Sequence, residues 1–139
     1  MPDINQKTIL LVEDEPIIAM VHKRILISNG YQVMIARTGE QAIEMADQNN
    51  HINLILMDIN LGAGIDGTDA AKIILDRHDI PLVFLSSHTE KEVVEKTEDI
   101  TSYGYIVKDS GETVLLASMK MAFKLFDAKV KEKEKENAL

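Results

Sequence analysis

The stretch LILMDINLGAGIDG, residues 54–67, sets four apolar residues directly before the carboxylate of Asp58 and follows it with a glycine-rich loop. The apolar run has the length and composition of a short strand that is buried on both faces. A carboxylate at the end of such a strand is costly to bury unless it is paired, hydrogen-bonded or bound to a metal. Asp58 is therefore expected either to reach solvent at a strand end or to face a positive partner.

The rest of the chain alternates short apolar runs with segments of helical spacing. Further strands are predicted at residues 8–12, 31–36, 80–85 and 104–107, and helices at 16–30, 38–50, 69–79, from about residue 90, and at 111–130. Five buried strands alternating with five helices predict an α/β domain whose parallel sheet is covered on both faces. In the first helix the apolar residues at helical spacing are Ile17, Met20, Val21, Ile25 and Leu26, and in the last they are Leu115, Met119, Ala122 and Phe126.

Length and composition indicate one globular domain. Of 139 residues, 45% are hydrophobic and 27% are charged, which is ordinary globular usage. We expect residues 1–128 to form this domain, and the charged segment 129–139 to be a linker or the frayed end of the last helix. The scattered histidines His22, His51 and His78 are predicted to lie on the surface.

Composition also excludes several functions. The absence of cysteine rules out disulfides and thiolate chemistry. A net charge of -8 with 4% aromatic residues argues against direct nucleic-acid binding, which needs clustered Lys and Arg. No apolar run approaches the length of a membrane span and no signal-peptide pattern is seen, so we expect no membrane contact and a cytoplasmic location.

Polar groups follow several of the predicted strands. Glu13 and Asp14 follow the first strand, Asp58 ends the third, Ser86 follows the fourth and Lys108 follows the fifth. Ligands of parallel α/β sheets gather at the carboxyl ends of the strands, so these groups are expected to converge. An all-oxygen acid cluster suits Mg²⁺, and acids, metal, hydroxyl and lysine together suit a phosphoryl group. With no cysteine, the sensible nucleophile is a carboxylate, and Asp58 is the best candidate.

These motifs resemble the receiver domains of two-component response regulators. The matching pieces are LLVEDE, LILMDIN, DG, PLVFLSS and GYIVK, and the resemblance covers residues 8 to about 128. The intervals from Asp14 to Asp58, from Asp58 to Ser86 and from Ser86 to Lys108 are 44, 28 and 22 residues. The resemblance implies a flavodoxin-like three-layer sandwich with its five strands in the order 2-1-3-4-5.

The resemblance also implies residue roles. Asp58 would accept phosphate, while Glu13, Asp14, Asp58 and the backbone carbonyl of Asn60 would serve Mg²⁺, with Mn²⁺ as a substitute. The remaining roles are those of Ser86 as switch hydroxyl, Lys108 as phosphate-binding cation, Tyr105 as switch aromatic, and Asn60 with His88 as tuners of phosphate hydrolysis.

The implied partners are a histidine kinase or a histidine phosphotransfer protein. An output domain or a second copy would bind the face made by the fourth helix, the fifth strand and the last helix. The domain either stands alone or belongs to a longer regulator or hybrid kinase.

Three features depart from the family pattern. The loop after Asp58 lacks the usual Met-Pro pair and puts Gly67 nine residues on, one more than usual. The acid pair is Glu13-Asp14 rather than two aspartates, and Asp109 replaces the proline that commonly follows the lysine.

Two other functions remain open beside the phosphorylated switch. A metal-dependent phosphatase with an aspartyl nucleophile uses the same groups but needs a second acid two residues after the nucleophile, where this chain has Asn60. A receiver-like domain that binds partners without phosphate is disfavoured because every chemical group is present.

Overall fold

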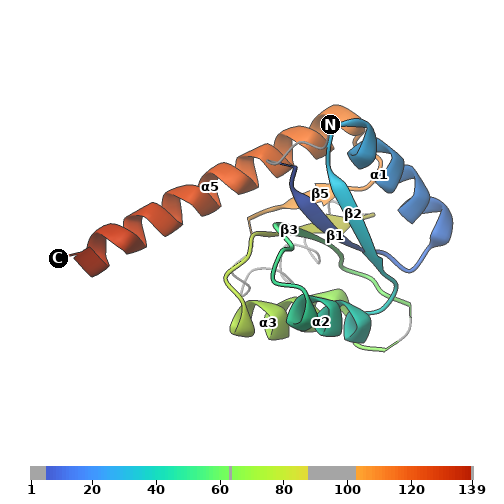
Figure 1. The fold of residues 1–139 in the computed structure, drawn as a ribbon. Coiled ribbons are helices and arrows are strands. Elements are labelled where there is room, and N and C mark those ends of the chain that lie inside the picture. The colour runs from blue at the N-terminus through green and yellow to red at the C-terminus, as the bar shows by residue number, and fades with distance from the viewer. Residues whose placement is uncertain (1–5, 63, 88–102, 139) are drawn as a thin grey trace.

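The computed structural model describes residues 6–62, 64–87 and 103–138. Their centre is a parallel sheet in the order β2-β1-β3-β4-β5 (Figure 1), which confirms the predicted order. The strands are β1 (Thr8–Val12), β2 (Gln32–Ala36), β3 (Leu54–Asp58), β4 (Leu82–Ser86) and β5 (Tyr105–Val107). Every residue of β1, β3 and β4 is buried, as the continuous apolar runs predict for strands covered on both faces.

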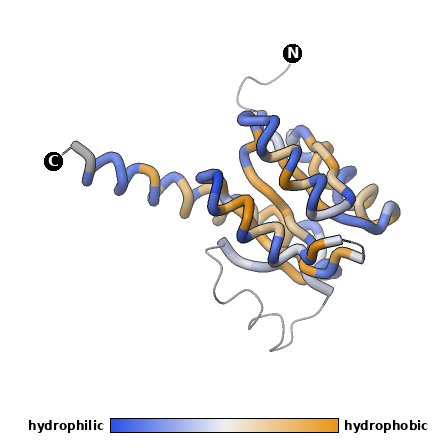
Figure 2. The backbone as a smooth tube through the Cα atoms, turned by 90° about the horizontal axis from the view of Figure 1, so that it is seen from below, coloured by the Kyte–Doolittle hydropathy of each residue, from blue (hydrophilic) through white to orange (hydrophobic). Residues whose placement is uncertain are grey.

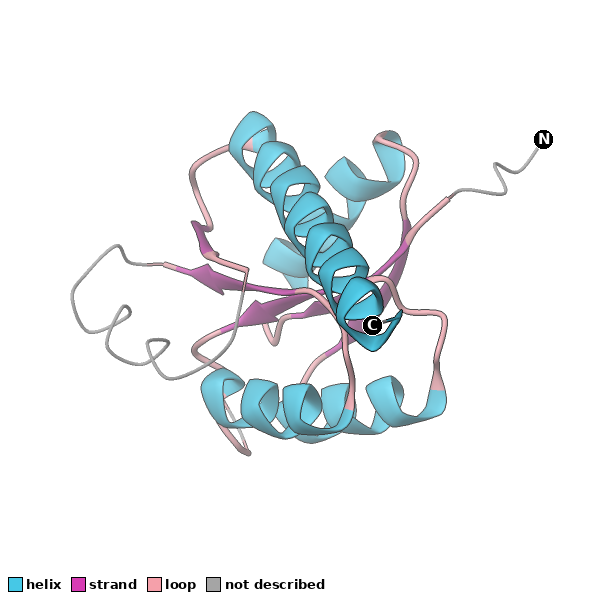
Figure 3. Cartoon of the chain, turned by 90° about the vertical axis from the view of Figure 1, so that its left-hand side faces the viewer, coloured by secondary structure: helices cyan, strands magenta, loops and turns pink. Residues whose placement is uncertain are grey.

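Two helical layers cover the sheet, giving the three-layer sandwich expected from the sequence. The helices are α1 (Pro16–Ser28), α2 (Gly39–Gln48), α3 (Gly67–Arg77) and α5 (Glu112–Ala138). Figure 3 shows α1 and α5 on one face and α2 and α3 on the other. A hydrophobic core lies on each face of the sheet, and successive strand residues point to opposite faces. Leu10 and Met57 pack with α2 and α3, whereas Leu11 and Leu56 pack with α1 and α5.

Local sequence signals set the ends of the helices. Pro16 occupies the first turn of α1, where its missing N–H is not needed, and Gly30 ends the α1 connection with φ +89°. The Thr38 hydroxyl accepts a hydrogen bond from Gln41 N at 3.0 Å, and Asp66 caps α3 through Gly67 N. These caps define the N-terminal ends of α2 and α3.

The apolar residues at helical spacing in α1 divide between a buried and an exposed face. The helix buries Ala19, His22 and Leu26, whereas Ile17 is 79% and Met20 61% exposed. Both faces of this apolar helix carry hydrophobic residues at the same spacing, so periodicity alone does not select the buried one. The prediction that His22 lies on the surface fails for the same reason, since this residue is only 6% exposed.

The last helix, α5, is long and protrudes from the domain. Of the predicted apolar stripe, Leu115, Met119 and Ala122 are buried and Phe126 is partly buried, while the residues from 127 to 136 are exposed. Figure 2 shows hydrophilic residues dominating its protruding end. The charged segment 129–138 thus forms the last turns of α5, and its role as a linker stays a prediction.

Two further expectations concern helices. The helix expected from about residue 90 lies outside the described residues. Among the helices that are described, none has a stretch long and apolar enough to cross a membrane.

Candidate functional site

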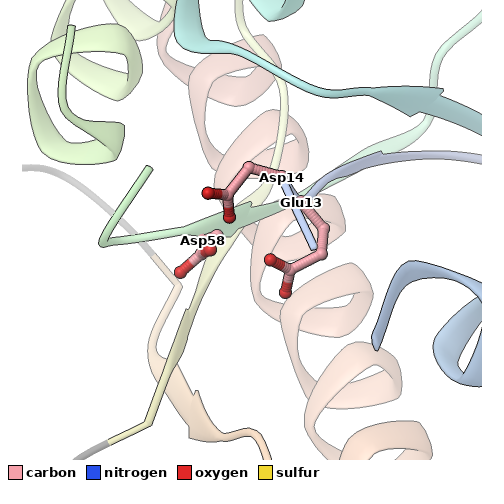
Figure 4. A group of neighbouring side chains, drawn as sticks. All are labelled: Glu13, Asp14 and Asp58. Carbon is pink, nitrogen blue, oxygen red and sulfur yellow. The ribbon is translucent and has the colours of Figure 1, made fainter. Parts of the chain in front are cut away.

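Three carboxylates converge at the carboxyl ends of β1 and β3. Oxygen atoms of Glu13, Asp14 and Asp58 all lie within 4.8 Å of one another, and Figure 4 shows the side chains pointing together. Glu13 is fully buried and Asp58 is 2% exposed, whereas Asp14 is half-buried. The three acidic side chains therefore converge, as expected from the ends of neighbouring strands.

Lys108 is the positive partner that Asp58 requires. Its Nζ lies 3.1 Å from Asp58 Oδ2 and 2.6 Å from Glu13 Oε1, and its side chain is 12% exposed. The backbone N–H of Lys108 donates to Ser86 O at 2.7 Å, which ties this turn to the end of β4. One ammonium group thus bridges the two buried carboxylates, an arrangement in which each charge has a close opposite charge.

The pKa values of Asp58 and Asp14 are shifted in opposite directions. Burial raises the pKa of Asp58 to about 7, helped by hydrogen bonding with the Glu13 carboxyl and opposed by the charge of Lys108. Burial opposes ionisation of Asp14 too, but the Gly62 N–H and hydrogen bonding with Glu13 hold its pKa below the usual range. Although burial favours neutral Lys108, the Glu13 and Asp58 carboxylates raise its pKa.

Backbone donors from the loop after β3 orient two of the acids. Asn60 N donates to Asp58 Oδ1 at 3.1 Å, and Gly62 N donates to Asp14 Oδ2 at 3.0 Å. Each carboxylate therefore has one oxygen fixed by a neutral donor. Hydrogen bonds of this kind hold ligating carboxylates in a defined orientation.

The donor set fits a hard divalent cation. Three carboxylates face one ammonium group, so the cluster keeps an excess of negative charge when its acids are ionised. Oxygen ligands of this type, few in number and open to water on the Asp14 side, match the preference of Mg²⁺. The roles of Glu13, Asp14, Asp58 and the Asn60 carbonyl as ligands remain predictions.

Two of the other predicted site residues, Ser86 and Tyr105, belong to described strands. Ser86 ends β4 and is fully buried, and Tyr105 begins β5 and is 43% exposed. The register places Tyr105 opposite Phe84. His88 lies outside the described residues, so its predicted role with Asn60 in phosphate hydrolysis is not tested.

His22, which was predicted to lie on the surface, is buried next to the site. Its ring lines the same cavity as Lys108, and its Nδ1 has no hydrogen-bond partner among the described residues. The cavity, of about 140 Å³, lies between α1 and the turn at residues 107–111. Hydrogen bonds from Ser110 N and Oγ to Val107 O hold the turn in which Asp109 replaces the family's proline.

Acid is expected to destabilise the fold through His22. Burial lowers the pKa of His22, and the backbone of Lys108 and the charge of Glu13 only partly oppose this. Because the unfolded chain then binds a proton that the native state does not, stability is lost as the pH falls below the ordinary histidine pKa. Asp58 contributes the opposite pH dependence equally to both proteins, so urea unfolding between pH 7.5 and 5 should show the stability of His22→Gln rising relative to that of the wild type as the pH falls. His51→Gln, on the surface, should match the wild type, and equal slopes for all three would contradict this.

Comparison with known proteins gives the family. A family model described as the response regulator receiver domain matches residues 9–120. The N-terminal domain of a response regulator/sensory box/GGDEF 3-domain protein from Carboxydothermus hydrogenoformans is 45% identical, with a TM-score of 0.83. That similarity covers 89% of this chain and 99% of that one.

Two further similar proteins extend the comparison. Response regulator protein TrrA from Thermotoga maritima, in complex with Mg(2+)-BeF, is 27% identical with a TM-score of 0.74, over 84% of this chain and 99% of that one. The transcriptional regulatory protein PdtaR of Mycobacterium tuberculosis is 29% identical over 121 residues, which are 86% of this chain but only 58% of that protein. The chain belongs to the response regulator receiver domain family of two-component signalling proteins.

Proposed function

We propose that this receiver domain takes a phosphoryl group onto Asp58 from the phosphohistidine of a histidine kinase or histidine phosphotransfer protein. The observation that carries the proposal is the buried Asp58 carboxylate beside Lys108 and two further acids. An Asp58 oxygen forms the new bond to phosphorus while the P–N bond of phosphohistidine breaks. The leaving imidazole nitrogen keeps the electron pair and takes up a proton.

Bound Mg²⁺, or Mn²⁺ in its place, would neutralise oxygens of the transferring group. Glu13, Asp14, Asp58 and the Asn60 carbonyl are the residues proposed to hold it, Glu13 through water. Lys108 already contacts Asp58 Oδ2, so it is positioned to move to a phosphate oxygen once the acyl phosphate forms. Asn60 and His88 are proposed to tune hydrolysis of that acyl phosphate.

The phosphate would shift the domain between two conformations. Ser86 ends β4, and its carbonyl oxygen accepts a hydrogen bond from the backbone N–H of Lys108. Movement of Ser86 or of Lys108 would therefore be transmitted to β5. Tyr105, partly exposed on β5, is proposed to change position and alter the face formed with α5. An output domain or a second copy of the chain, in the cytoplasm, is proposed to recognise this face.

A phosphate mimic tests the switch. Amide-exchange mass spectrometry with beryllofluoride and Mg²⁺ is expected to show changed protection at Tyr105 and at the start of α5. Lys108→Ala and Ser86→Ala should weaken this response, because both couple the phosphate to shape, whereas Lys72→Ala on exposed α3 should leave it intact. Coupling free energies between sites are typically about 1–3 kcal/mol, so partner affinity should change by roughly five- to 150-fold.

Amide exchange, combined with an assay of phosphomonoester hydrolysis, separates the switch from a phosphatase. Repeated hydrolysis of small phosphomonoesters, with changed protection only beside Asp58, would favour the enzyme and contradict the switch. An enzyme of that class needs a proton donor two residues after the nucleophile. The Asn60 side chain is an amide and cannot supply that proton.

A further inference from the structure

The lengthened loop after β3 is attached to two carboxylates. Gly62 N donates to Asp14 Oδ2 at 3.0 Å, and Ile65 N donates to Glu40 Oε1 at 2.6 Å. Asp14 belongs to the acidic cluster, whereas Glu40 lies in the first turn of α2, on a different element. Hydrogen bonds from backbone N–H groups to a carboxylate are charge-assisted and roughly twice as strong as neutral ones.

The contact with Glu40 is close enough to restrict the residues around it. A Cβ at Gly64 would overlap the Glu40 carboxylate, and Gly64 has φ +77°, which favours glycine. A Cβ at Gly39 would lie 2.7 Å from a side-chain carbon of Ile65. Glycines on both sides therefore let the loop sit directly on the start of α2.

We infer that Glu40 is a positioning residue for the metal ligand Asp14, an inference that rests on the proposed metal site. Only two residues separate Gly62 from Ile65, and the segment contains glycines at 62 and 64. Glycine has more backbone conformations open to it than other residues, so Gly62 and Gly64 need contacts that fix them. By holding Ile65, Glu40 keeps Gly62 N–H on Asp14 Oδ2, and that bond leaves the other Asp14 oxygen oriented for the cation.

Amide exchange without metal tests the first step. In ¹⁵N-labelled protein, Glu40→Ala is expected to speed exchange of the Gly62 and Ile65 amides about tenfold, because both bonds open when the loop is released. Glu40→Gln keeps an acceptor for Ile65 N and should stay within about threefold of the wild type. Glu44→Ala, one turn further along α2 and hydrogen-bonded to Gln48, is the matched control and should show no change.

Calorimetric titration with Mg²⁺ tests the second step. Loss of residues that orient metal ligands typically lowers metal affinity by 10–100-fold. Because Glu40 acts through the loop rather than on Asp14 itself, we expect a loss of about three- to tenfold for Glu40→Ala and less than about twofold for Glu40→Gln.

The outcomes are distinct. Unchanged Gly62 exchange in Glu40→Ala overturns the inference. Equal losses of Mg²⁺ affinity in the Ala and Gln variants also overturn it, because they would mean that the charge of Glu40 acts at long range. A wild type that does not bind Mg²⁺ would contradict the proposed metal site, while the exchange measurement would still decide whether Glu40 positions Gly62 on Asp14.

Discussion

Asp58→Asn is expected to stabilise the fold at pH 8 in the absence of Mg²⁺. Asp58 is 2% exposed, and burial raises its pKa to about 7 from an ordinary value near 3.8. Ionising this group in the native state therefore lowers stability, and an amide of the same shape does not ionise. After the substitution Lys108 still has Glu13 at 2.6 Å, so no buried charge is left unpaired.

The gain should depend on pH. Between the two pKa values the native state holds a proton that the unfolded chain has released, so wild-type stability falls as the pH rises through this range. We expect Asp58→Asn to gain about 2 kcal/mol at pH 8, where the wild-type carboxylate is ionised in the native state, and little at pH 4. Urea unfolding at both pH values measures it.

Mg²⁺ and a surface aspartate provide the controls. Mg²⁺ should stabilise the wild type more at pH 8 than at pH 5, because it binds ionised carboxylates, and it should do much less for Asp58→Asn. Asp76→Asn, on the exposed side of α3, should change stability by less than about 0.5 kcal/mol. A loss of stability in Asp58→Asn at pH 8 would show that the carboxylate is better satisfied than its burial indicates.

Gly67→Ala is expected to destabilise the protein strongly. Gly67 is the first residue of α3, and a Cβ there would overlap the main chain of Asp58 and lie 3.0 Å from Ile59 O. Since backbone atoms at the end of β3 have no room to move aside, α3 must shift away from the sheet. Overpacking of this kind lowers the free energy of unfolding by roughly 1–3 kcal/mol, and we expect about 3 kcal/mol here.

Gly30→Ala is the matched control for this substitution. Gly30 has φ +89°, but a Cβ added there would meet nothing within 4 Å, so only backbone strain of about 1 kcal/mol is expected. Denaturant titration of both variants compares them directly. If Gly67→Ala is no more destabilised than Gly30→Ala, α3 does not lie against Asp58 as the structure has it.

The sheet was predictable because its strands are continuous apolar runs. In a continuous apolar run both faces are buried, so no inward-facing set of residues has to be chosen. Each observed strand lies within two residues of its predicted ends. The resemblance to receiver domains supplied the strand order, which apolar runs alone do not determine. The helix expected from about residue 90 lies outside the described residues and stays a prediction.

The phase of α1 was not predictable from spacing. Ile17, Met20 and Val21 share one face, and Ala19, His22 and Leu26 another, and both faces repeat at helical spacing. The buried face is selected by tertiary packing against β1 and β2, which a local pattern does not contain. His22 was therefore assigned to the surface although it lines the same cavity as Lys108.

In the site, the sequence predicted which groups gather but not how they pair. Glu13, Asp14, Asp58 and Lys108 could be found from their positions after strands. That Lys108 contacts Glu13 more closely than Asp58 depends on side-chain packing. The contact between Glu40 and Ile65 joins α2 to a loop 25 residues away, and an acid in the first turn of a helix is common enough to carry no such signal.

Asp58 is proposed to accept a single phosphoryl group. The most direct measurement is intact mass spectrometry after incubation with acetyl phosphate and Mg²⁺, followed by peptide mapping. One phosphoryl increment is expected on the peptide that contains Asp58, and no increment when Mg²⁺ is chelated or when the Asp58→Asn variant is used. Undiminished labelling of Asp58→Asn, or an increment on any other residue, would contradict it.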